Sequence, residues 1–154
     1  MNLLSDCIPT AILSKSEPTS EQLIDALISL KENGRLLESD IPQPDELPYG
    51  RKVLYGNTNF EVILVHLPAF CTTRIHDHGE SIGAALVLEG QLINTLFKSN
   101  DAGSVQPYEH QHVMKDELFI ATRKQIHQMS NPHAEKVVSL HIYAPPLNNV
   151  QVYV

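Results

Sequence analysis

Two histidines that stand two residues apart, His76 and His78, carry the clearest chemical signal in the sequence. Residues i and i+2 of a β-strand point to the same side, so two imidazoles at this spacing can bind one ion. A third ligand must then come from a distant strand, and His127 is the candidate for it. We therefore predict a metal site made of these three histidines.

The predicted ligands are all neutral, which restricts what such a site binds. Three uncharged imidazoles leave the charge of a divalent ion uncompensated, so the site favours anionic ligands, a thiolate among them. Iron oxygenases more often use two histidines and one carboxylate, and three histidines with water also suit Zn²⁺. Spacing alone leaves iron and zinc both open. A second pair with the same spacing, His110 and His112, lies in a polar stretch, and we expect a solvated edge there.

Three polar residues spaced by two, Ser139, His141 and Tyr143, fall on one face of a predicted strand. A chain of this kind can orient a phenol by hydrogen bonds and move a proton. The alternative is a polar strand face that is turned to solvent. An exposed face more usually carries Lys, Glu or Thr, so we favour the functional interpretation.

Tyr49 and Arg51 share one side of the chain in the same way if this segment is extended. An arginine offers a fork of donors that binds a carboxylate through two hydrogen bonds. Taken alone, an arginine that opens a strand is most often a surface residue.

The elements that must position these groups change character near residue 48. The first part, 1–47, is predicted to be helical, with a capping box at Thr19 to Gln22, a stop at Gly34 and a second short helix at Leu36 and Leu37. The stretch 39–47, which breaks the helical pattern with prolines, is the predicted junction between helices and sheet. From residue 48 to 154 the sequence predicts a β-barrel or sandwich. The predicted strand segments are 60–67, 83–97 with a turn at Glu89-Gly90, 117–122, 137–144 and 149–154.

The composition suits one domain of 154 residues, of which 42% are hydrophobic. The net charge of −7 repels phosphate, so nucleic acid is not an expected partner. No apolar run reaches the ~18 residues that a membrane span needs. Cys7 and Cys71 form neither a disulfide framework nor a metal-type pair, and we expect a cytoplasmic protein.

The order and spacing of the motifs resemble those of the cupins. His76-Asp77-His78 is followed by Gly83 and Gly90, and His127 begins a His-x-x-x-Asn sequence. The resemblance implies a mostly β fold, the double-stranded β-helix or jelly-roll barrel, here with N-terminal α-helices. Many cupins carry a metal-binding glutamate at the position where this chain has Gly83.

Within the cupins, the sequence resembles type I cysteine dioxygenase, of the bacterial type among the thiol dioxygenases. The resemblance is carried by Y-x-R at 49–51, IHDH at 75–78, GQLINTLF at 90–97 and SLHIYAPP at 139–146. It implies that L-cysteine is oxidised by O₂ to cysteine sulfinate. The roles that it implies are Fe(II) held by His76, His78 and His127, the substrate carboxylate bound by Arg51 with Tyr49, and Tyr143 beside the iron with His141 and Ser139 behind it.

The resemblance also has departures and rivals. Animal members carry a cysteine at the position of Gly83 and link it to the tyrosine, so Tyr143 is expected to be a free phenol here. The family further implies a cis bond before Pro145. One rival is a dioxygenase for another small thiol acid such as 3-mercaptopropionate, although that branch usually has Gln in place of the arginine. Another is a cupin that binds Zn²⁺ or Ni²⁺ without redox chemistry.

Overall fold

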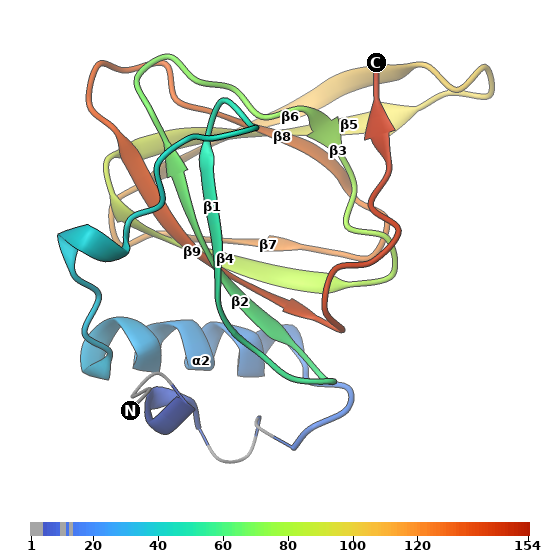
Figure 1. Cartoon of the computed structure of the whole chain (residues 1–154). Coiled ribbons are helices and arrows are strands. Elements are labelled where there is room, and N and C mark those ends of the chain that lie inside the picture. Colours follow the sequence, from blue (N-terminus) through green and yellow to red (C-terminus); the bar gives the residue numbers. More distant parts are fainter. Residues whose placement is uncertain (1–4, 10–11, 13) are drawn as a thin grey trace.

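The computed structural model describes residues 5–9, 12 and 14–154, so part of the predicted N-terminal helical segment lies outside the described residues. Two five-stranded antiparallel sheets face each other (Figure 1). The first sheet contains, in spatial order, β1 (Gly50–Gly56), β2 (Glu61–Leu67), β9 (Val137–Ala144), β4 (Ile82–Glu89) and β7 (Leu118–Ala121). The second contains β10 (Val152–Tyr153), β3 (Ile75–His76), β8 (Ile126–Ser130), β5 (Gln91–Ser99) and β6 (Val105–Met114).

The predicted strands are confirmed where the sequence is strongly apolar. The segments 60–67, 83–97, 117–122 and 137–144 match β2, β4 with β5, β7 and β9 to within two residues at each end, and the turn lies at Gly90 as predicted. The terminal segment 149–154 contributes only the two residues of β10. The sequence gives no signal for β6, because this strand lies at a sheet edge and most of its side chains are exposed. His110 and His112 lie on β6 and are exposed, as expected for a solvated edge.

The helix α2 (Ser20–Asn33) begins and ends as the sequence predicts. The Thr19 hydroxyl accepts a hydrogen bond from the Gln22 amide, and the Gln22 side chain accepts one from the Thr19 amide. At the other end the Gly34 amide donates to the Leu30 carbonyl, and a Cβ at Gly34 would collide with that oxygen. The predicted second helix is not an α-helix, because a 3₁₀ turn, η2 (Glu38–Asp40), forms after Leu37 instead. Another 3₁₀ turn, η1 (Ser5–Cys7), lies near the N-terminus.

The helix α2 covers the outer face of the first sheet (Figure 1). Its buried residues Leu23, Ala26, Leu27 and Leu30 pack in one core with the outward-facing side chains of the sheet. A second core lies between the two sheets. In the part of the chain that the structure describes, no helix is both long and apolar enough to cross a membrane.

The alternation of side chains along β9 separates these two cores. Val138, Leu140 and Ile142 pack in the core that includes α2. Ser139, His141 and Tyr143 therefore point into the barrel, and all three are buried. The alternative of a solvent-facing polar strand is thus wrong, because the first sheet is covered on both faces.

Candidate metal centre and adjoining cavity

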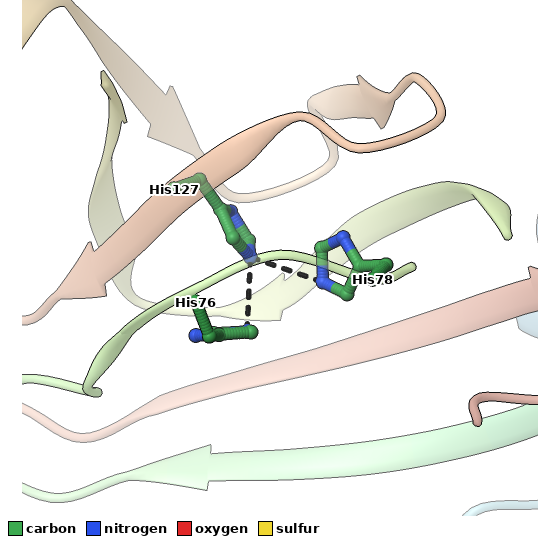
Figure 2. Close-up of side chains that lie close together, drawn as sticks. All are labelled: His76, His78 and His127. Atoms are coloured by element: carbon green, nitrogen blue, oxygen red, sulfur yellow. Dashed lines mark hydrogen bonds between the residues drawn. The ribbon is translucent and has the colours of Figure 1, made fainter. Parts of the chain in front are cut away.

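The three predicted histidines meet inside the barrel, as Figure 2 shows. His76 ends β3 and lies in register with His127 on β8. His78 reaches the site from the segment after β3. The Nε2 atom of His127 lies 3.2 Å from Nε2 of His76 and 3.1 Å from Nε2 of His78. These are the two contacts drawn as dashed lines in Figure 2.

Hydrogen bonds on the far side of two rings fix which nitrogen carries the proton. Nδ1 of His127 lies 2.7 Å from Oδ1 of Asn94, and Nδ1 of His76 lies 2.7 Å from the carbonyl oxygen of Arg74. Since these oxygens only accept, both Nδ1 atoms must donate when the rings are neutral. Their Nε2 atoms then present lone pairs to each other and cannot form a hydrogen bond.

A cation placed between the nitrogens would remove the repulsion between these lone pairs. With metal–nitrogen bonds of about 2.1 Å, two ligand nitrogens lie about 3.0 Å apart at a right angle and about 3.4 Å apart at a tetrahedral angle. The distances of 3.1 and 3.2 Å fall in this interval. The ligand atoms of the three residues all lie within 4.8 Å of one another. The site therefore fits one metal ion held by three Nε2 atoms.

Burial keeps these rings neutral. Desolvation lowers the pKa of His78 to about 3, and the neighbouring charge of His76 adds to the effect. Desolvation also lowers the pKa of His76 and lowers that of His127 well below its usual range. Unprotonated imidazoles are the form that binds metal, so the site is ready for a metal ion at neutral pH.

The side chains of Ser139, His141 and Tyr143 form one hydrogen-bonded chain. Oγ of Ser139 lies 2.7 Å from Nε2 of His141, and Nδ1 of His141 lies 3.1 Å from the Tyr143 hydroxyl oxygen. Burial lowers the pKa of His141 to about 3 and raises the pKa of Tyr143. Both groups are therefore neutral at pH 7.

Tyr143 joins this chain to the metal centre. Its ring packs against the ring of His78, with centroids 4.7 Å apart. On its edge lies Gly83, which pairs with Tyr143 in the sheet. A Cβ at Gly83 would lie 2.6 Å from Cδ1 and 2.7 Å from Cε1 of Tyr143, so the glycine makes room for the ring. Because Gly83 has no side chain, it cannot be covalently linked to the phenol of Tyr143.

A cavity of about 560 Å³ opens beside the metal centre. It is lined by His76, His78 and Tyr143, by Arg51 on β1 of the first sheet and by Tyr49 just before β1. The structure thus brings the two predicted clusters together with the histidines. Ser139, His141 and His127 do not line this cavity. Ser139 and His141 reach Tyr143 through hydrogen bonds, and His127 lies against His76 and His78.

The segment 147–152 closes one side of the cavity and is held by two carboxylates. The Asp77 side chain accepts hydrogen bonds from the Gly79 and Gln151 amides and from the Tyr153 hydroxyl. Burial would raise the pKa of Asp77, but these hydrogen bonds outweigh it and lower the pKa. The Leu147 amide donates to Glu61. The peptide bond between Ala144 and Pro145, just before this segment, is cis.

Two supporting residues escaped the sequence analysis. Asn94 is fully buried and accepts the hydrogen bond of His127, and an asparagine inside the apolar run LINTLF was the signal for it. Asp77 lies between two predicted ligands, and nothing in the local sequence indicates that it holds the C-terminal segment.

The family model and the curated relatives that match this chain carry the same family name. A family model described as "Cysteine dioxygenase type I" matches residues 31–154. The "Cysteine dioxygenase type 1" of Danio rerio is 27% identical over 141 residues, which are 82% of this chain and 70% of that protein. The human protein of the same name is 28% identical over 114 residues, or 71% of this chain. The chain spans 57% of the length of the human and bovine relatives.

Solved structures show the same fold at low identity. A protein of Klebsiella pneumoniae with a double-stranded β-helix domain has a TM-score of 0.62 at 16% identity, covering 79% of this chain and 93% of that chain. A recombinant oxalate oxidase has a TM-score of 0.57 at 15% identity, covering 68% of this chain and 55% of that one. These likenesses establish the fold alone, and they confirm the predicted cupin barrel.

Proposed function

Because the chain belongs to the cysteine dioxygenase type I family, we propose that it oxidises L-cysteine to cysteine sulfinate with O₂. Fe(II) held by His76, His78 and His127 is the proposed cofactor. The observation that carries the proposal is the shared cavity, in which a neutral metal site, a buried phenol and an unpaired arginine face one space. In the reaction, both oxygen atoms of O₂ bond to the thiolate sulfur, which loses four electrons while O₂ gains them.

The metal would supply what side chains lack. When bound, Fe(II) provides the one-electron chemistry that lets O₂ react with a thiolate. Three neutral ligands leave a net positive charge, which favours binding of an anionic sulfur. The chain's own contribution is to bind the substrate, to orient it and to hold protons at fixed positions.

Arg51 is the proposed partner of the substrate carboxylate. Its guanidinium lines the cavity and forms no ion pair or hydrogen bond within the described part of the chain. A guanidinium can bind a carboxylate through two parallel hydrogen bonds. Tyr49, two residues before Arg51, also lines the cavity and is the second proposed substrate-binding residue.

Through His141, the Ser139 hydroxyl determines the direction in which the phenol proton of Tyr143 points. Its side chain is fully buried, and His141 is its only hydrogen-bond partner among the described residues. A buried hydroxyl proton left without an acceptor costs about 1–3 kcal/mol, so Ser139 donates to Nε2 of His141. Nδ1 of neutral His141 then carries the proton and donates to the Tyr143 oxygen. The phenol proton of Tyr143 is thereby left to donate into the cavity, toward a bound substrate.

Turnover of L-cysteine by Fe(II)-loaded protein tests the proposal. We expect cysteine-dependent O₂ consumption with one sulfinate formed per O₂. A fully iron-loaded protein that forms no sulfinate would contradict the proposal. Metal analysis of the native protein addresses the non-redox rival, since three histidine nitrogens also suit Zn²⁺.

Substitution of Arg51 tests how the substrate is held. A charge-assisted hydrogen bond contributes about 1.5–3 kcal/mol, and Arg51 is exposed, so Arg51→Ala is expected to raise KM for L-cysteine about tenfold. Lys52→Ala is the matched control, since Lys52 is an exposed cation that does not line the cavity. An unchanged KM for Arg51→Ala would remove Arg51 from substrate binding.

A further inference from the structure

A second arginine, Arg74, lines the same cavity from the opposite sheet. Arg51 lies on β1, at the edge of the first sheet, whereas Arg74 directly precedes β3 of the second sheet. The Arg74 carbonyl accepts the hydrogen bond of His76, which stands two residues further on. Two residues at this spacing share one side of an extended chain, and both line the cavity. The cavity therefore has a guanidinium on each of two walls.

Neither guanidinium is neutralised by the protein. The chain has 18 acidic and 11 basic side chains, yet no ion pair of the described residues includes Arg51 or Arg74. Among the residues that the structure describes, no aspartate or glutamate lines the cavity. The carboxylates of Glu61 and Asp77 do not line the cavity, and both accept hydrogen bonds from the C-terminal segment. Two positive charges thus face the cavity without a counterion from the described chain.

Tyr49 lies within electrostatic reach of both charges. Burial raises the pKa of its phenol, while the guanidinium groups of Arg51 and Arg74 lower it. One phenol of the cavity wall therefore feels both arginines, which act on a common region of the cavity.

We propose that Arg74 is a second anion-binding residue, so that the cavity binds thiols with two carboxylates more tightly than thiols with one. The inference rests on the proposed function for the binding of the thiolate at the metal and of one carboxylate at Arg51. Arg74 is then the cation that remains for a second negative group. The cavity volume of about 560 Å³ lies within the usual range of ~300–1,000 Å³ for small-molecule sites.

Comparing two small thiols measures the contribution of a second carboxylate to binding. Mercaptosuccinate equals 3-mercaptopropionate with one further carboxylate on the carbon that bears sulfur. We would titrate both into the Fe(II)-loaded full chain without O₂ by calorimetry, so that binding is measured in the absence of turnover. We expect mercaptosuccinate to bind more tightly. Arg74→Gln should reduce this preference about fivefold, and Arg74→Lys should retain most of it.

Arg123→Gln is the matched control, because Arg123 is exposed, does not line the cavity and forms no ion pair among the described residues. Equal binding of the two thiols to the unsubstituted protein would overturn the inference, as would equal weakening of both by Arg74→Gln. Sulfinate formation from L-cysteine is measured in parallel. If the protein oxidises L-cysteine but does not prefer mercaptosuccinate, only the role of Arg74 is refuted. If it prefers mercaptosuccinate but does not oxidise L-cysteine, only the proposed function is refuted.

Discussion

Replacing Gly83 with alanine should displace the Tyr143 ring. The new Cβ would lie 2.6 Å from Cδ1 and 2.7 Å from Cε1 of the ring, and 3.3 Å from the Ile142 carbonyl oxygen. Carbon atoms in contact normally lie about 3.5–4.0 Å apart. The new Cβ is fixed by the backbone of β4, so the Tyr143 ring must move away from it by about 1 Å.

The structure leaves the ring little space for this movement. Tyr143 is 7% exposed, its ring packs against His78, and its oxygen accepts the hydrogen bond of His141. Overpacking of a buried site costs about 1–3 kcal/mol. We expect the free energy of unfolding of Gly83→Ala to fall by about this amount. The rate of the proposed cysteine oxidation should fall as well, because the phenol leaves its position beside the candidate metal centre.

Urea denaturation of metal-free protein measures the effect, with Gly56→Ala as the control. Gly56 lies in the same sheet, and its new Cβ would have only ordinary contacts, 3.7 Å to the Glu61 Cβ and 4.0 Å to the Phe60 oxygen. This control should be neutral or slightly stabilising, by up to about 1 kcal/mol. Equal stability of the two variants, with cysteine oxidation unimpaired in Gly83→Ala, would refute the proposed close fit.

Two further predictions follow from supporting hydrogen bonds, and a third follows from the burial of His78 and His141. Asn94→Ala removes the acceptor for His127, so metal affinity measured by competition with a chelator should fall about 10- to 100-fold, whereas Gln106→Ala on the exposed edge strand should leave it unchanged. Tyr153→Phe removes a donor to Asp77, so hydrogen exchange of residues 147–154 should become faster, while Tyr108→Phe should have no effect there. For metal-free protein, the pKa of His78 and His141 is lowered to about 3 in the folded state, so the unfolded chain takes up protons first as pH falls below about 6.5. The free energy of unfolding should then decrease by about 1.4 kcal/mol per pH unit for each histidine between pH 6.5 and 3, and urea midpoints that do not change from pH 7 to pH 5 would contradict this.

The sequence predicted the site where local periodicity determines the geometry. The two-residue spacing along β9 is enough to place Ser139, His141 and Tyr143 on one face, and the apolar residues between them indicate a strand. His76 and His78 were predicted from the same rule, although β3 ends at His76 and the chain continues without strand pairing to His78. The identity of the third ligand required the family motif, because the register between β3 and β8 is not a local property.

The residues that the sequence missed act through long-range neighbours. Asn94 supports His127 only because β5 lies beside β8, and Asp77 holds Gln151 only because β10 lies beside β3. Arg74 resembles an ordinary surface arginine in the sequence. Its position becomes meaningful only when the two sheets place it on the same cavity as Arg51.

Because α2 covers the outer face of the first sheet, β9 can carry polar side chains on its inner face. Leu140 and Ile142 pack against the helix side of the first sheet, so β9 is stabilised by apolar burial on its outer face. Its inner face can then carry Ser139, His141 and Tyr143 without exposing them. The desolvation that this burial imposes opposes protonation of His141, which keeps the ring neutral and able to accept the hydrogen bond of Ser139. The outer apolar layer is therefore a physical condition for the proton arrangement of the inner polar one.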